Sequence, residues 1–321
     1  MPPDPVTRQG TTSTEASPPT PLSLSSCVTL RNGVKMPILG FGTYRISECE
    51  PFEHALALGY RLIDTGSYYL NEELIGQALK ASGIAREEVF LTTKVWTTEM
   101  GYEGTLEACA KSLARFDTPY IDLYLAHWPV NDTMRDTWRA MEELYRAGKV
   151  RAIGVSNYEE CDLALLAQHA TVMPMVNQTE LHPRLQQPEL CAYCKELGIQ
   201  MEAHTPIMRS QVRFIRELGE IGAKYNKTEC QVALRWEIQR GWVSIPKAQN
   251  LYHIEENAQL FDFTLTEEEM AVIDDLDRDD RMGPNPDTFR LDAHALEKGN
   301  LPEMVQMFLK ERGDFDKGSH M

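Results

Sequence analysis

The sequence lacks any surplus of positive charge. Its 321 residues carry 32 Lys and Arg against 48 Asp and Glu, which gives a formal net charge of −16. Nucleic acids and anionic membrane surfaces are bound through basic patches that neutralise phosphates, so this composition argues against both kinds of partner. A local basic pocket for one small phosphate stays compatible with it.

Long hydrophobic runs and a cysteine framework are also missing. No stretch approaches the length of about 20 apolar residues that a membrane helix needs. Seven scattered cysteines, an odd number, are typical of reduced thiols in an intracellular protein. Cys191 and Cys194 form a C-x-x-C motif inside a helical pattern. The sequence has no second C-x-x-C pair to complete a zinc site, so we expect two ordinary helix residues there. These features predict a cytoplasmic protein.

The two ends of the chain carry little that could build a core. Residues 1–26 are rich in Pro, Ser and Thr and almost without large apolar side chains, which predicts a disordered extension. This segment has no apolar run and one Arg, so neither a secretory signal nor a transit helix is indicated. The final GSHM resembles a vector remnant. We therefore expect one domain over residues 27–313 and a tail over 314–321.

Within that domain, strand-like and helix-like segments alternate. Asn32-Gly33 stands between two short alternating runs and predicts an N-terminal β-hairpin. Eight βα units follow, which favours a (β/α)8 barrel over a doubly wound sheet. The segment LGFGTY lacks the third glycine of a dinucleotide-binding turn. The eight predicted strands are ILGFGTY, YRLIDTG, VFLTTKVW, YIDLYLAHWP, RAIGVSN, MVNQTEL, IQMEAHTPI and WVSIPKA.

Polar side chains stand where these strands end. In a parallel barrel the chemistry gathers at the C-terminal ends of the strands. Asp64 follows an apolar run, and a buried strand has no use for a carboxylate, so Asp64 is either a helix cap or part of a site. The residues at the strand ends are Tyr44, Asp64, Lys94 with Trp96, His127 with Trp128, Ser156 with Asn157, Gln178 with His182, His204, and Lys247.

Several longer segments resemble the aldo-keto reductase pattern, in register from about Val28 to Phe289. They are GYRLIDTGSYYLNEELIGQAL, FLTTKVW, YIDLYLAHWP, RAIGVSNY, MVNQTELHP, LRWEIQRGWVSIPK and GPNPDTF. MGYEGTL and IGAKYNKTECQVALRWEIQ are similar to the prostaglandin F synthase and 2,5-diketogluconate reductase group of that family. The resemblance implies NAD(P)H-dependent reduction of aldehydes or ketones, with a catalytic tetrad of Asp64, Tyr69, Lys94 and His127.

The chemistry of that tetrad is self-consistent. A phenol with an ordinary pKa of about 10 is a poor acid at neutral pH, and the nearby ammonium of Lys94 favours its phenolate. Asp64 compensates the buried cation, and His127 can donate a hydrogen bond to the substrate carbonyl. The second tyrosine, Tyr68, is expected to pack on the barrel rim.

The resemblance also implies a set of cofactor-binding residues. Ser156, Asn157 and Gln178 match the residues that hold the nicotinamide carboxamide, whereas His204 replaces the aromatic residue that stacks on the ring. At the adenosine end Ala248 and His253 replace a Ser and an Arg that grip the 2′-phosphate. We expect NADPH, with NADH as the alternative. The set comprises Ser156, Asn157, Gln178, His204, Thr205, Pro206, Ile207, Arg209, Lys247, Ala248, His253, Glu256 and Asn257.

Tyr44, Trp96, His127 and Trp128 are the expected substrate-binding residues, and they predict an apolar pocket mouth for a small carbonyl compound in a monomeric protein. One alternative function is a barrel that binds cofactor poorly and serves as a binding or regulatory protein. A second is a metal-dependent hydrolase built on the histidines and Asp64, although no H-x-H or HExxH pair is present and we expect no metal. A Schiff-base aldolase is a third, and an ion-paired Lys94 would be a poor nucleophile for it.

Overall fold

Eight parallel strands form one sheet that curls into a barrel. The structure, a computed structural model, describes residues 21–286. The strand order runs without interruption from β10 to β3, and bridges from Leu39 to Ser244 and from Gly42 to Lys247 join the two outer strands. Each strand overlaps one of the eight predicted runs, and only β7 extends beyond its run, by one residue at Val150. The strands are β3 (Phe41–Gly42), β4 (Leu62–Asp64), β5 (Phe90–Val95), β6 (Ile121–Ala126), β7 (Val150–Ser156), β8 (Val176–Glu180), β9 (Gln200–His204) and β10 (Val243–Ser244).

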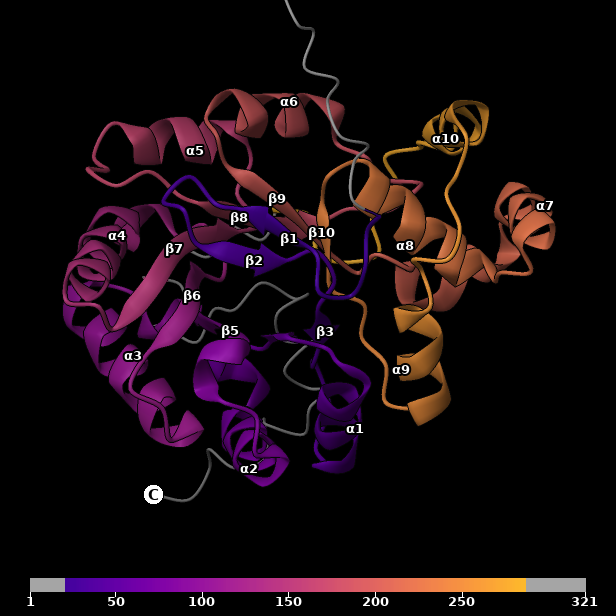
Figure 1. Cartoon of the computed structure of the whole chain (residues 1–321). Helices are drawn as coiled ribbons and strands as arrows, with labels where there is room; N and C mark the ends of the chain where they lie inside the picture. The colour runs from indigo at the N-terminus through magenta and orange to yellow at the C-terminus, as the bar shows by residue number, and fades with distance from the viewer. Residues whose placement is uncertain (1–20, 287–321) are drawn as a thin grey trace, which may run out of the picture.

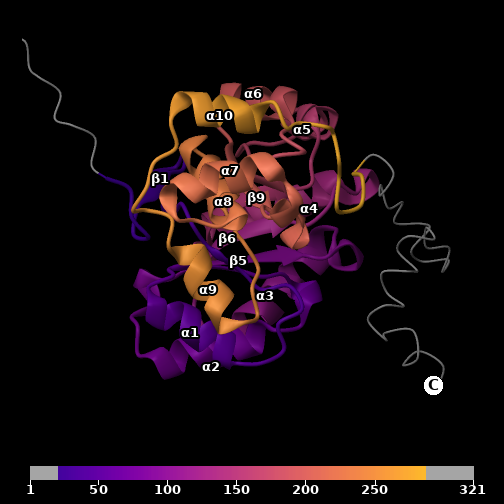
Figure 2. The same ribbon diagram turned by 90° about the vertical axis from the view of Figure 1, so that its right-hand side faces the viewer.

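Helices surround the sheet, as Figures 1 and 2 show. Their inner faces are apolar at helical spacing: α3, for example, buries Ala108, Cys109 and Phe116, and the residue that caps its C-terminus, Asp117, is in the left-handed conformation. No described helix combines the length and apolarity needed to cross a membrane. The helices are α1 (Glu50–Leu58), α2 (Glu72–Ser82), α3 (Tyr102–Phe116), α4 (Asn131–Arg146), α5 (Glu160–Ala167), α6 (Pro188–Glu196), α7 (Arg216–Tyr225), α8 (Glu229–Gln239), α9 (Leu251–Ala258) and α10 (Glu267–Asp274).

The predicted hairpin is present and covers the N-terminal ends of the barrel strands. Strands β1 (Cys27–Thr29) and β2 (Lys35–Pro37) pair antiparallel around Asn32-Gly33, where Gly33 takes a φ of 87°. The turn reaches the barrel through Asn32, whose side-chain amide donates to the carbonyl of Arg151 at the start of β7. The C-terminal ends of the strands, where the polar residues gather, lie at the opposite end of the barrel.

The boundaries of the domain differ in part from the sequence expectation. Residues 21–26, predicted as part of the disordered extension, include a turn in which Ser26 donates to the carbonyl of Ser23 and accepts from the amide of Ile38. The described chain therefore contacts the hairpin before residue 27. Residues 1–20 of the predicted extension, the end of the GPNPDTF motif and the predicted tail over 314–321 lie outside the described residues.

Candidate active site

A buried ion pair stands at the C-terminal ends of β4 and β5. Lys94 Nζ donates to Asp64 Oδ1 at 2.6 Å and to the carbonyl of Thr65 at 2.7 Å. The side chains of Lys94 and Asp64 are 0% and 3% exposed. Asp64 does not cap the following helix, because Asn71 is the residue that precedes α2. The carboxylate at the end of the strand compensates a cation that water cannot reach.

Tyr69 lies directly above this pair. It ends a short 3-10 helix (Ser67–Tyr69), and the Lys94 Nζ atom is 5.1 Å from the centre of its ring. Burial raises the pKa of the phenol to about 12, although the Lys94 ammonium lowers it. The effect of Lys94 therefore has the predicted direction, but burial outweighs it, so the phenol is fully protonated at neutral pH.

His127 faces the same space from the end of β6. Its ring centre is 5.7 Å from that of Tyr69, and its Nδ1 atom is buried with no hydrogen-bond partner among the described residues. Burial holds the pKa of this imidazole well below its ordinary value, and the positive charge of Lys94 lowers it further. The close approach depends on Gly66, where a Cβ atom would lie 3.3 Å from His127 Cε1.

Aromatic rings line the space around Tyr69 and His127. The ring of Tyr44 lies 5.0 Å from that of Tyr69, and the ring of Trp96 lies 5.0 Å from that of His127 in an edge-to-face arrangement. Tyr68 stacks on Trp96 with ring centres 4.0 Å apart. Trp128 is 8% exposed. Tyr44, Trp96 and His127, three of the four predicted substrate-binding residues, thus form one group with Tyr69.

Ser156, Asn157 and His204 form a hydrogen-bonded group beside His127. Asn157 Nδ2 donates to the carbonyl of His127 at 3.0 Å and lies 3.1 Å from Ser156 Oγ. Its Oδ1 atom is 2.9 Å from His204 Nε2. Burial lowers the pKa of His204 to about 4, so the imidazole at the position of the stacking aromatic is uncharged at neutral pH.

Gln178, which is paired with Ser156 across strands β7 and β8, contacts the buried ion pair through its side chain. Its Nε2 atom donates to Asp64 Oδ2 at 2.7 Å and to Glu202 Oε2 at 2.9 Å. Both amide hydrogens are therefore used inside the protein, and only Oε1 remains to accept a hydrogen bond. Glu202, in the middle of β9, escaped the sequence analysis. The available signal was a carboxylate inside a buried strand, two residues before His204 and so on the same face.

The loop after β9 has a strained backbone. Met208, Arg209 and Ser210 take φ values of 51°, 51° and 70°, a region that favours glycine. Thr205, with a φ of 57°, accepts from the amide of Met208 through its carbonyl. Three successive left-handed residues leave this loop in a conformation that glycine would adopt without strain. The predicted cofactor residues Thr205, Pro206, Ile207 and Arg209 all lie in this loop.

The residues predicted for the adenosine end follow β10 and begin α9. Lys247 is bridged to Gly42 across the closing seam of the barrel. Crowding by protein atoms and repulsion from Arg45 lower the pKa of Lys247. His253 Nδ1 is 3.1 Å from Glu256 Oε2, so this histidine is paired with a carboxylate of its own helix. Ala248, which follows Lys247, and Asn257, which follows Glu256, are both buried.

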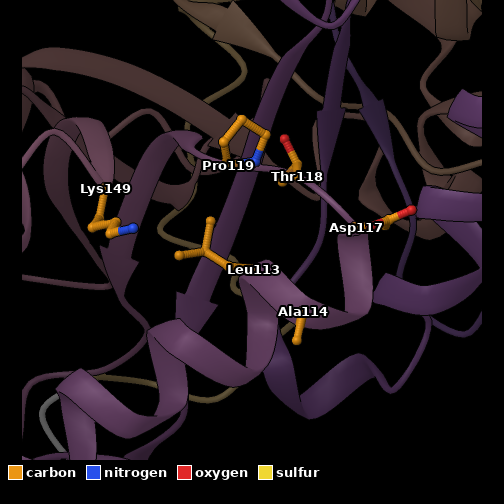
Figure 3. Close-up of a pocket in the computed structure, with 6 residues that line it drawn as sticks. All are labelled: Leu113, Ala114, Asp117, Thr118, Pro119 and Lys149. Carbon is orange, nitrogen blue, oxygen red and sulfur yellow. The ribbon is translucent and has the colours of Figure 1, made fainter.

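The other groups singled out in the sequence are a histidine, possible metal ligands and a pair of cysteines. His182 Nε2 is 3.0 Å from Glu180 Oε1, and both side chains are buried. Residues 21–286 contain no group of three His, Cys, Asp or Glu that could hold a metal ion. Cys191 and Cys194 are free thiols on α6. A surface pocket of about 380 Å³ (Figure 3) lies at the opposite end of the barrel, where α3 leads into β6; its lining residues are Leu113, Ala114, Asp117, Thr118, Pro119 and Lys149.

An α/β barrel with a Tyr–Lys–Asp cluster and a histidine at the C-terminal ends of its strands has the architecture of a barrel oxidoreductase. The chain belongs to the aldo/keto reductase family, whose sequence profile matches residues 43–278. It is similar to the glyoxal reductase of Bacillus subtilis (strain 168), with 50% identity over 271 residues that cover 83% of this chain and 98% of that protein.

Two further comparisons bear on the site. The 9,11-endoperoxide prostaglandin H2 reductase of Trypanosoma cruzi (strain CL Brener) is 47% identical over 271 residues, which cover 82% of this chain and 96% of that protein. The crystal structure of a Bombyx mori aldo-keto reductase in complex with NADP superposes with a TM-score of 0.77 at 33% identity. That match covers 84% of this chain and 98% of the silkworm chain.

Proposed function

We propose that this protein reduces small aldehydes and ketones to alcohols with NADPH, and that Tyr69 is the proton donor. The observation that carries this assignment is the buried unit of Tyr69, Lys94 and Asp64, in which a protonated phenol lies over an ammonium that is itself held by a carboxylate. A lysine with a solvent-facing role would be exposed, whereas the Lys94 side chain is 0% exposed.

The residues of the chain divide the work. Tyr69 donates its proton to the carbonyl oxygen as negative charge develops there. Lys94 stabilises the phenolate that Tyr69 becomes, and Asp64 keeps Lys94 charged. His127 is uncharged because of its lowered pKa, and its one N–H donates to the substrate oxygen and orients it. The bound cofactor supplies the hydride that adds to the carbonyl carbon.

The site has groups that fit a dinucleotide phosphate. Repulsion from Arg45 contributes to the lowered pKa of Lys247, and the Lys247 side chain is exposed. An anion placed between two such cations relieves their repulsion. Ser156, Asn157 and the remaining Oε1 atom of Gln178 would hold the carboxamide, and His204 would lie against the nicotinamide ring. The NADP-bound silkworm relative supports this choice of cofactor.

The apolar walls and the relatives narrow the substrate class. The rings of Tyr44 and Trp96 lie against Tyr69 and His127, and Trp128, which follows His127 in the sequence, is expected to extend this apolar wall. Such a site takes a compact carbonyl compound and binds it mainly through its reacting oxygen. Glyoxal reductase acts on a small dicarbonyl, so we propose α-oxoaldehydes such as glyoxal and methylglyoxal as substrates.

Tyr69→Phe tests the assignment. Single-turnover reduction of methylglyoxal should slow by about 10²- to 10⁴-fold, because the general acid is lost. The dissociation constant of NADPH, measured by protein fluorescence, should change less than about twofold, because the phenol acts on the substrate. Tyr68→Phe is the matched control, since it removes a neighbouring hydroxyl and keeps the ring stacked on Trp96. Turnover of Tyr69→Phe near the wild-type rate would remove Tyr69 from the mechanism, and failure of the wild type to bind NADPH would favour a binding or regulatory role.

A further inference from the structure

A second carboxyl group lies beneath the catalytic ion pair, inside the barrel. Glu202 is 0% exposed, and Gln178 is its direct neighbour on the adjacent strand β8. The Nε2 atom of Gln178 bridges two acids, with Glu202 Oε2 at 2.9 Å and Asp64 Oδ2 at 2.7 Å. The other oxygen of Glu202, Oε1, is buried and has no hydrogen-bond partner among the described residues.

These contacts join four strands into one polar chain. From Glu202 on β9 the chain passes through Gln178 on β8 to Asp64 on β4, and from Asp64 to Lys94 on β5. Tyr69 stands above the far end, with Lys94 Nζ 5.1 Å from its ring centre. Because water is excluded along this chain, a change of charge at Glu202 is poorly screened from Lys94 and Tyr69.

Asp64 and Glu202 accept hydrogen bonds from the same Gln178 amide in an interior without water, and their pKa values differ. Asp64 has Lys94 at 2.6 Å and takes the negative charge. No described residue forms an ion pair with Glu202, and burial and the Asp64 carboxylate together raise its pKa to about 8. Such interacting acids titrate as a unit, and the first proton leaves from the acid beside the lysine.

The other neighbours of Glu202 bring no opposite charge. On β10 the residue paired with Glu202 is Val243, followed by Ser244. The Ser244 hydroxyl donates to Glu237 Oε2 at 2.6 Å, and burial holds the pKa of Glu237 well above its ordinary value. The charged groups that act on Glu202 are therefore Asp64 and Lys94.

We propose that Glu202 is a positioning residue for the tyrosine acid: in its neutral form it fixes Gln178 and Asp64 beneath Lys94, and its ionisation weakens proton donation by Tyr69. This inference rests on the proposed role of Tyr69. An ionised Glu202 places a second negative charge on the side of the lysine away from the phenol. That charge partly cancels the positive potential of Lys94 at Tyr69 and so disfavours the phenolate. Tyr69 becomes a poorer acid, and carbonyl reduction slows.

The first measurement is the single-turnover rate of hydride transfer from NADPH to methylglyoxal, at saturating concentrations from pH 6 to 10. In the wild type we expect the rate to fall about threefold to tenfold as Glu202 ionises, centred at about pH 8. Glu202→Gln keeps an oxygen for Gln178 but cannot ionise, so this step should vanish. Glu202→Thr, which also offers an oxygen and no titrating group, is the second variant.

Glu237→Gln is the matched control, because Glu237 is another fully buried carboxyl, on helix α8, and it accepts a hydrogen bond from Ser244 rather than from a residue of the polar chain. It should keep the wild-type pH profile. Tyr69→Phe separates the two proposals. If Tyr69→Phe retains activity, the assignment of Tyr69 as the acid fails. If Tyr69→Phe loses activity but Glu202→Gln keeps the pH profile of the wild type, only the proposed role of Glu202 is overturned.

A second measurement does not depend on turnover. In protein labelled with ¹³C at the Glu carboxyl carbon, the signal that disappears in Glu202→Gln should titrate in the cofactor-free wild type with a midpoint near pH 8. A midpoint at the ordinary Glu value of about 4.3 would overturn the proposal. So would a wild-type rate profile without a step between about pH 7 and 9, and this outcome can be read even if neither Glu202 variant folds.

Discussion

Replacing Asp64 by Asn should destabilise the fold strongly, and by an amount that depends on pH. The change is nearly isosteric and leaves one carbonyl oxygen for Gln178, but it removes the carboxylate 2.6 Å from Lys94 Nζ. Lys94 is 0% exposed, so no water can replace the lost charge. The variant therefore isolates one contribution, the compensation of a buried cation.

The size of the effect follows from two limits. At 2.6 Å the attraction between the charges is on the order of 6 kcal/mol for an effective dielectric constant of about 20. Lys94 can escape part of this loss by releasing its proton, which at pH 7 costs about 4 to 5 kcal/mol from an ordinary pKa of about 10.4. We therefore expect Asp64→Asn to lower the free energy of unfolding by about 3 to 5 kcal/mol at pH 7.

The sign of the pH dependence is fixed by the pKa of Lys94. Burial lowers the pKa of Lys94 in the wild type, but Asp64 and the other acidic neighbours outweigh it, so the net pKa is raised. The contribution of a raised lysine pKa is fully present below about pH 10.4 and is lost above it. In Asp64→Asn the pKa falls below that value, so the folded variant gains stability as pH rises. Its deficit should shrink by about 1.4 kcal/mol per unit between pH 7 and 9.

Urea unfolding followed by circular dichroism at pH 7, 8 and 9 measures these free energies. Asp64→Asn combined with Lys94→Met should be more stable than Asp64→Asn alone, because the uncompensated cation is gone. The control is Glu107→Gln, which breaks the exposed pair between Glu107 and Lys111 and should leave the unfolding free energy unchanged. A loss below about 1 kcal/mol, or a loss independent of pH, would refute Asp64 as the anion that keeps Lys94 charged.

Two further variants test the surroundings of the site. His253→Arg should tighten NADPH about threefold to tenfold and leave NADH nearly unchanged in fluorescence titrations, because a permanently charged fork would replace a histidine that is paired with Glu256; equal effects on both cofactors would place His253 away from the 2′-phosphate. Glu237→Gln should be more stable than the wild type at pH 8, and its advantage should grow from pH 5 to 8 in urea unfolding. The raised pKa of Glu237 gives stability that is present below its ordinary value of about 4.3 and is lost as pH rises toward the folded-state value; a constant difference between pH 5 and 8 would show that the pKa of Glu237 is not raised in the folded protein.

The sequence by itself determined the barrel and the residues at its mouth. Apolar runs separated by amphipathic helices specify parallel strands, and the C-terminal ends of parallel strands meet at one end of the barrel. That rule was enough to bring Asp64, Lys94 and His127 together before any coordinates were known. Tyr69 needed the family resemblance, because it lies after its strand on a short 3-10 helix whose direction no periodicity reveals.

The protonation states of the site residues could not be predicted from the sequence, because they depend on the folded environment. The sequence predicts that Lys94 lowers the pKa of the Tyr69 phenol. In the structure the pKa of Tyr69 rises to about 12, because the effect of burial is larger than that of the lysine. The sequence could not foresee that His204 is uncharged, since its pKa of about 4 is set by burial among residues from several strands. Glu202 meets Gln178 across neighbouring strands and, through that residue, Asp64 from 138 positions earlier in the chain. The pKa shift caused by burial depends on all the atoms that the fold places around a group, so no local sequence pattern predicts it.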